Sequence, residues 1–159
     1  MKNFSVFRFC IGVWLMMYIL PMGLYIPNPG TAADKAQLRQ LVSLMDDYET
    51  QCDDPELREL LSYTSDKYRY ISRWNVRIVD FGDLDIAGMN WPHMPGMSLD
   101  RWCWENLEDD SLVGLMLHEA LHDYWPCFGH DHMMHLVPVR NLNTGQNAWA
   151  KFLKEKDTR

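Results

Sequence analysis

The sequence predicts an α+β domain in which helices lie before and after a short mixed sheet. Two segments near the start of the domain have apolar residues at helical spacing, and a later segment alternates apolar with polar residues as a strand does. A further helical segment follows the strand and contains His118-Glu119-Ala120-Leu121-His122. The chain of 159 residues is long enough for one domain with one core.

Residues 1–33 are predicted to precede this domain. Two basic residues come before an almost wholly apolar run at 9–26, which is followed by proline, glycine and alanine. Two interpretations compete: a secretory signal peptide cut near Ala32 or Ala33, and an uncleaved membrane anchor, which we prefer. Both place residues 34–159 outside the cytoplasm, because the positive charge precedes the apolar run. The domain is then either membrane-anchored on the periplasmic or extracellular side, or secreted.

The charge of the domain limits its partners. The chain has a formal net charge of −7, and its first 32 residues hold two basic residues and no acid, which leaves 13 basic against 22 acidic residues in the remainder. So acidic a domain is a poor partner for nucleic acid or for an anionic membrane surface. We expect contact with a membrane only through the N-terminal segment.

Three cysteines belong to the domain: Cys52, Cys103 and Cys127. One disulfide and one free thiol suit an oxidising compartment, and the sequence does not select the pair.

The elements expected in the domain follow from apolar spacing and from turn residues. Helices are predicted at 33–50 and 54–63, a strand at 74–81, turns at 81–83 and 87–88, a short strand at 97–99, a turn or helix start at 100–104, and a closing helix at 146–156. We expect the tyrosines at 63, 68 and 70 to pack together. The strand Met97-Ser98-Leu99 is expected at a sheet edge, where an extended substrate can add as a further strand.

The segment that follows is predicted to be the metal-binding helix. Acidic residues at 108–110 suit a helix start, and Pro126 stops the helix after Tyr124 or Trp125. Residues four apart on a helix share one face, so His118 and His122 can present two imidazoles to one metal ion.

The third metal ligand is expected in the segment after Pro126. Gly129 permits a reversal of the chain, and five of the six histidines fall between positions 118 and 135. We predict His130 as the third ligand. The alternatives are His132, His135 and the carboxylates of Asp131 and Glu155, whereas His93 lies between prolines and is expected to be a loop residue.

The motif resembles that of the zincin metallopeptidases, over about residues 74–135. The metzincin branch has its third histidine six residues after the second, where this chain has Phe128. The Gly129-His130 pair with Met133 or Met134 after it is instead similar to SprT-like minimal zincins and to small exported metallopeptidases of bacteria. The resemblance implies a minimal zincin-like fold with a Zn²⁺ ion.

This resemblance and the residues together predict hydrolysis of a peptide bond in a protein or peptide substrate. Zn²⁺ would be held by His118, His122 and His130, and Glu119 would take a proton from a metal-activated water. Tyr124 and Arg140 are candidates for stabilising the oxyanion. Two alternatives stay open: a membrane-tethered binding or accessory protein with a structural or degenerate metal site, and amide hydrolysis of a non-protein substrate such as a cell-wall peptide.

Overall fold

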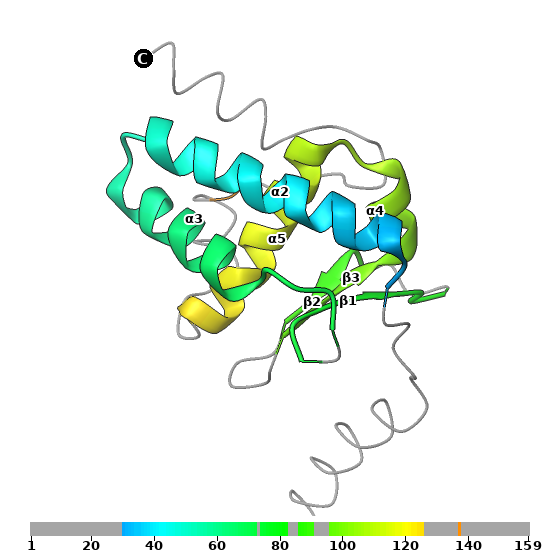
Figure 1. Ribbon diagram of the computed structural model, residues 1–159. Helices are drawn as coiled ribbons and strands as arrows, with labels where there is room; N and C mark the ends of the chain where they lie inside the picture. Colours follow the sequence, from blue (N-terminus) through cyan, green and yellow to red (C-terminus); the bar gives the residue numbers. More distant parts are fainter. Residues whose placement is uncertain (1–29, 73, 83–85, 91–95, 126–136, 138–159) are drawn as a thin grey trace, which may run out of the picture.

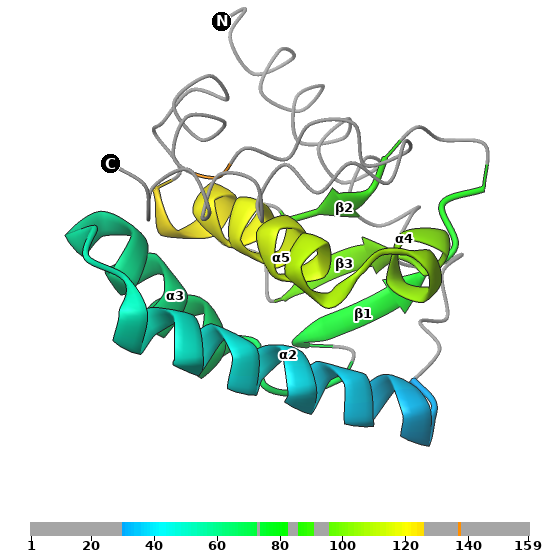
Figure 2. The same cartoon turned by 90° about the horizontal axis from the view of Figure 1, so that it is seen from above.

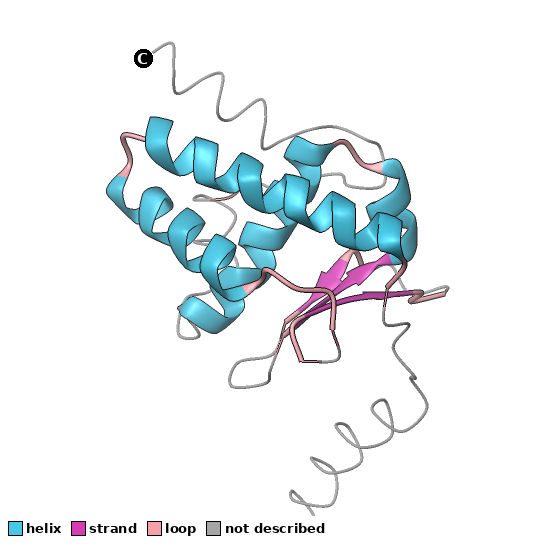
Figure 3. Cartoon of the chain, viewed as in Figure 1, coloured by secondary structure: helices cyan, strands magenta, loops and turns pink. Residues whose placement is uncertain are grey.

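The computed structural model describes residues 30–72, 74–82, 86–90, 96–125 and 137. Within these residues the fold is α+β, with four helices and a three-stranded sheet (Figures 1 and 3). The predicted fold class is therefore confirmed at this level. The closing helix expected at 146–156 lies outside the described residues.

Two long helices open the described part of the chain and lie side by side (Figure 1). Helix α2 spans Ala32–Gln51, and the side chain of its N-cap Thr31 accepts from the backbone N–H of Asp34. Helix α3 spans Pro55–Lys67, with the side chain of Asp54 as its cap. Each cap satisfies backbone N–H groups that have no acceptor inside the helix.

The sheet has the strand order β1-β3-β2. Strand β1 (Val76–Val79) pairs with β3 (Met97–Asp100) in parallel, and β2 (Gly88–Met89) pairs with β3 in antiparallel. The sheet is thus mixed, as predicted. However, β3 is the central strand, so the expectation that residues 97–99 form an edge strand was wrong. Among the described strands, β1 and β2 form the two edges of the sheet.

Helix α5 (Asp109–Tyr124) is the centre of the domain. It contacts α2 and α3 on one side and strands β2 and β3 on the other, so that it lies between the helix pair and the sheet (Figure 2). Every residue from Ser111 to Leu121 is buried. The short helix α4 (Arg101–Asn106) joins β3 to α5 and contacts β1 and β3.

Several predicted boundaries shift. Helix α3 ends at residue 67 rather than 63, and β1 begins at 76 rather than 74. The pair Ala87-Gly88, predicted as a turn, instead leads into β2. Of the three tyrosines expected to pack, Tyr68 is buried but Tyr70 is 70% exposed. The turn sequence at Gly88–Met89 forms a two-residue strand because the partner strand β3 supplies the hydrogen bonds.

At the N-terminal side, α2 begins two residues before the expected boundary of the domain. No helix within the described residues is long and apolar enough to cross a membrane, and the apolar run at 9–26 lies outside them. Cys52 and Cys103 are free thiols, and Cys127 lies outside the described residues.

Candidate functional site

His118 and His122 lie on the same face of α5, as their spacing predicts. Their rings stand edge to face, with centroids 5.3 Å apart and planes at 84°. His118 is buried and His122 is half-buried. The fourth-residue spacing of a helix brings the two rings together, and burial of α5 fixes the backbone that carries them. The predicted pair of imidazoles is therefore formed.

Glu119 is the residue after His118, and its side chain is turned towards strand β2. Its side chain fits against Gly88 so closely that a Cβ atom on Gly88 would lie 2.7 Å from Glu119 Oε1 and 2.8 Å from Cγ. Only a residue without a side chain can occupy that position without displacing the carboxyl group. The sequence pattern at Ala87-Gly88 predicts a turn and gives no sign of the close contact between Gly88 and Glu119.

Glu119 is only 5% exposed. Burial raises its pKa to about 8, although a backbone hydrogen bond from Asn90 acts in the opposite direction. Desolvation penalises the charged form of the carboxyl group. A carboxyl group whose pKa lies close to neutral pH can both accept and release a proton at physiological pH. This is the property expected of a general base and acid.

Asn90 ties three elements together behind Glu119. Its Nδ2 group donates to the backbone carbonyl of Glu119 and to the hydroxyl of Tyr68, both at 2.8 Å. Asn90 follows β2, Tyr68 follows α3, and Glu119 belongs to α5. Both protons of the amide are thereby used. Asn90 carries no motif signal in the sequence, so only the structure identifies it.

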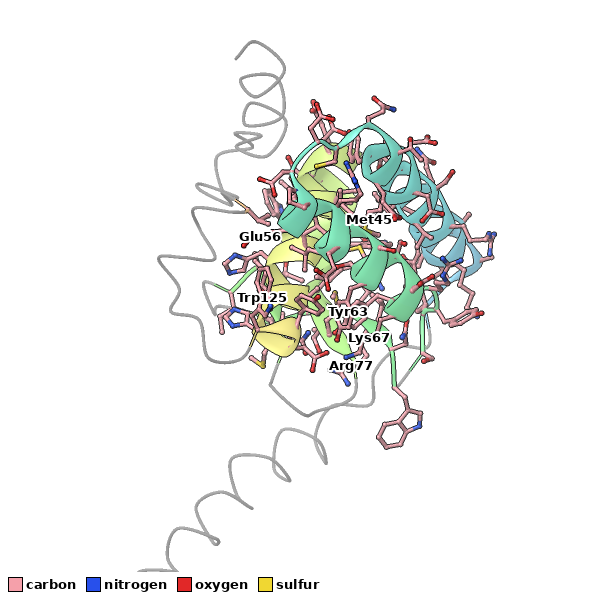
Figure 4. The ribbon with its side chains drawn as sticks, turned by 90° about the vertical axis from the view of Figure 1, so that its left-hand side faces the viewer. Met45, Glu56, Tyr63, Lys67, Arg77 and Trp125 are labelled. Atoms are coloured by element: carbon pink, nitrogen blue, oxygen red, sulfur yellow. The ribbon has the colours of Figure 1, made fainter. Side chains whose placement is uncertain are left out.

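Asp123 fastens the end of α5 to α3. Its carboxylate accepts hydrogen bonds from Tyr63 and Lys67, and a longer one of 3.4 Å from Tyr68. Figure 4 shows Tyr63 and Lys67 near each other on α3, where the Lys67 ammonium group donates to the Tyr63 hydroxyl at 2.7 Å. These contacts give Asp123 a structural role at the end of α5.

The third metal ligand is not described by the structure. His130, His132, His135, Asp131 and Glu155 all lie outside the described residues, as does His93. Within the described ranges, no group of three or more histidine, cysteine, aspartate or glutamate side chains is placed to hold a metal ion. The choice of His130 therefore stays a prediction.

Of the two residues considered for the oxyanion, Arg140 lies outside the described residues. The hydroxyl of Tyr124 donates to the carboxylate of Glu59 on α3, and its ring packs on Tyr63 and Trp125 with centroids 4.6 Å and 5.0 Å apart. Tyr124 is therefore engaged with the α3 side of the domain.

Comparisons of the chain with protein-family models, with curated proteins and with solved structures found no significant match.

Proposed function

We propose that this chain is a zinc-dependent metallopeptidase with a zincin-like site, and that it acts outside the cytoplasm. The observation that carries the proposal is the grouping of His118, His122 and Glu119. Two imidazoles lie side by side on a buried helix, and Glu119, the residue after His118, is almost fully buried. A histidine and a glutamate are costly to bury without a function that needs them.

The ring geometry of the histidine pair is compatible with a shared zinc ion. Two imidazoles bound to one tetrahedral zinc at about 2.0–2.1 Å have ring centroids roughly 5 Å apart. The centroids of His118 and His122 are 5.3 Å apart. His130 is proposed as the third ligand, with His132 and His135 as the alternatives. Bound zinc would supply positive charge that lowers the pKa of water and polarises a peptide carbonyl.

Glu119 is proposed as the proton carrier of the reaction. It takes a proton from the attacking water and later delivers it to the leaving amine. Its burial against Gly88 excludes bulk water from one side of the carboxyl group. Asn90 holds the backbone carbonyl of the same residue, and this contact limits movement of the base.

Strand β2 supports a protein or peptide as the substrate. Among the described strands it is an edge of the sheet, and its Gly88 touches Glu119. A substrate in extended conformation can pair with such an edge through backbone hydrogen bonds. Its scissile bond would then lie beside the base. The edge-strand role expected for residues 97–99 is thus proposed for Gly88–Met89.

The test replaces Glu119 by Gln and measures zinc content and peptide hydrolysis. We expect one bound zinc per chain in both proteins, and a loss of about 10²–10⁴-fold in hydrolysis for E119Q, since a positioned general base contributes that much. The exposed Glu56 on α3 gives a matched control, because E56Q makes the same chemical change at an exposed carboxylate outside the proposed site. H118A and H122A are expected to lose both zinc and hydrolysis.

Two results would overturn the proposal. A wild-type chain that binds zinc but hydrolyses neither protein nor peptidoglycan fragments would indicate a structural metal site, as in an accessory protein. Hydrolysis by E119Q at the wild-type rate would remove Glu119 from the reaction. Activity on peptidoglycan fragments alone would keep the chemistry and change the substrate class.

A further inference from the structure

The hydroxyl group of Tyr68 lies where α3, α5 and the end of β2 meet. Tyr68 is the C-cap of α3, and its side chain is fully buried. The hydroxyl accepts a hydrogen bond from Asn90 Nδ2 at 2.8 Å and donates one to Asp123 Oδ2 at 3.4 Å. Burial raises the pKa of this hydroxyl, so it stays protonated at neutral pH and keeps both bonds. One buried hydroxyl therefore joins residues from two other elements.

The bond from Asn90 leads to the proposed base. The other proton of Asn90 Nδ2 goes to the backbone carbonyl of Glu119 at 2.8 Å, and the backbone N–H of Asn90 donates to the Glu119 carboxyl group. Asn90 also directly follows β2, whose Gly88 fits against the same carboxyl group. The position of Asn90 thus sets the position of both β2 and Glu119.

The bond to Asp123 leads to the last turn of α5. Asp123 is the residue after His122, the second predicted zinc ligand. Its carboxylate also accepts from Tyr63 and Lys67 of α3, and Lys67 forms an ion pair with it. These donors fix the last turn of α5 against α3. Tyr68 is therefore tied to the part of α5 that carries the second imidazole.

The amide of Asn90 is unfavourable for stability alone. Its Oδ1 atom is buried and has no hydrogen-bond partner among the described residues. Because the Glu119 carbonyl can only accept, the amide cannot be turned over to use Oδ1 at that contact. A buried acceptor without a partner costs stability, whereas an apolar side chain of similar size would avoid that cost. A role in holding the base accounts for an amide at this position.

We propose that Tyr68 is a positioning residue of the site: its hydroxyl, through Asn90, holds Glu119 and strand β2 in place relative to the last turn of α5. Tyr68 acts through Asn90 and not on the substrate. The kinetic effect rests on the proposed peptidase function, whereas the mechanical link between Tyr68 and Asn90 does not. A base that is displaced by even about 1 Å lowers the rate of the chemical step, while substrate binding elsewhere is kept.

The first test compares Y68F with Y63F in the full chain loaded with zinc. Both substitutions remove a hydroxyl that donates to Asp123, and among the described residues only Tyr68 also accepts from the Asn90 amide. We expect Y68F to keep its zinc and its KM for a peptide substrate and to lose about 10–100-fold in kcat. Y63F, the matched control, should keep kcat within about twofold of the wild-type value.

A double-variant cycle with N90A separates positioning from packing. Because Tyr68 acts through Asn90, Y68F should add little to the loss in kcat that N90A causes alone. Losses that multiply in the double variant would instead mean that the two residues act independently, which would overturn the proposal. Thermal unfolding verifies that each variant is folded at the assay temperature; Y68F keeps the ring that fills the core.

Hydrogen exchange of the full chain tests the link without hydrolysis. Relative to the amides of α2, those of residues 88–90 should exchange about 2–10-fold faster in Y68F, because one buried hydrogen bond is lost. Y63F should leave this ratio unchanged. An exchange ratio or a kcat that is equal in Y68F and Y63F would overturn the proposal. If the wild-type chain hydrolyses no peptide, the proposed function fails, and the exchange ratio alone decides whether Tyr68 holds β2.

Discussion

Asp34 and Glu119 both carry buried carboxyl groups, but the pKa values of the two groups shift in opposite directions. Asp34 is 4% exposed and Glu119 is 5% exposed. Burial alone would raise the pKa of Asp34, but hydrogen bonds from Thr31 and the Arg101 guanidinium outweigh it and lower the pKa. The pKa of Glu119 is instead raised to about 8. The two residues have similar exposure but opposite pKa shifts, because the carboxyl group of Glu119 lies deeper in the domain and that of Asp34 has more hydrogen-bond donors.

Besides the deeper burial of Glu119, the donors that surround each group differ. Asp34 accepts from Thr31 N–H at 2.7 Å, from Arg101 at 2.9 Å and from Trp104 Nε1 at 3.0 Å. These bonds hold the charged form and join α2 to α4. Among the described residues, the backbone N–H of Asn90 is the one donor that lowers the pKa of Glu119 against the effect of desolvation. A buried carboxylate with a full set of donors is structural, whereas one with an uncompensated burial cost is a candidate for proton transfer.

The largest effect on stability is expected for Asp34→Asn. The substitution leaves Arg101 without its buried charged acceptor, and it should lower the free energy of unfolding by about 2–4 kcal/mol, less than for a fully buried pair because Arg101 is partly exposed. Urea unfolding measures it. Glu119→Gln is not expected to lower the same quantity, because an uncharged amide avoids the desolvation cost that raises the pKa of Glu119. Equal losses in the two variants would contradict the distinction between a structural and a functional carboxyl group.

The pH dependence of unfolding should separate the two groups as well. The folded pKa of Asp34 lies below its ordinary value of 3.8, so its contribution to stability is present above that pH and is lost as the pH falls through the lower, folded pKa. The folded pKa of Glu119 is raised, so in the metal-free chain its contribution is complete below 4.5 and is lost as the pH rises through about 8.

Chelator-treated protein unfolded in urea from about pH 3 to about pH 9 tests both signs. In D34N, the free energy of unfolding should fall less steeply as the pH is lowered. In E119Q, the same quantity should fall less steeply towards alkaline pH. A wild-type decline above neutrality that persists unchanged in E119Q would assign it to another group.

Gly88→Ala should perturb the candidate site through its packing. The added methyl group would lie 2.7 Å from Glu119 Oε1, so β2 or the carboxyl group must move, at a cost of about 1–3 kcal/mol. Hydrolysis should fall with it, because the base is displaced. Gly82→Ala adds the same methyl group where no atom lies within 4 Å and carries only the strain of a φ of 61°. G82A should therefore keep its activity. Equal activity in both variants would exclude a functional role for this contact.

The smallest effect is expected for Thr31→Ala, which removes the side-chain acceptor of the α2 cap. The loss should be about 1 kcal/mol in the free energy of unfolding. Thr50→Ala, at the exposed other end of α2, is the control and should change stability by less than about 0.5 kcal/mol. If T31A leaves the free energy of unfolding unchanged, the start of α2 contributes little to the stability of the domain.

The sequence alone predicted what depends on local patterns. Apolar spacing gave α2, α3 and α5 to within a few residues, and the spacing of His118 and His122 predicted a shared face. It did not predict the strand order, because β3 becomes central only through pairing with β1 and β2. For the same reason, Gly88 and Asn90 could not be assigned: their roles come from contacts with Glu119, about thirty residues away along the chain.

The complete burial of α5 has a consequence for the motions of the site. The helix contacts both the α2–α3 pair and the sheet, and each residue from Ser111 to Leu121 is buried. Its amide hydrogens can therefore meet solvent only when the core itself opens. In hydrogen-exchange experiments the segment that carries His118 and Glu119 should be among the slowest in the chain. The two rings and the carboxyl group thus belong to a part of the molecule that does not unfold locally while the rest of the domain stays folded.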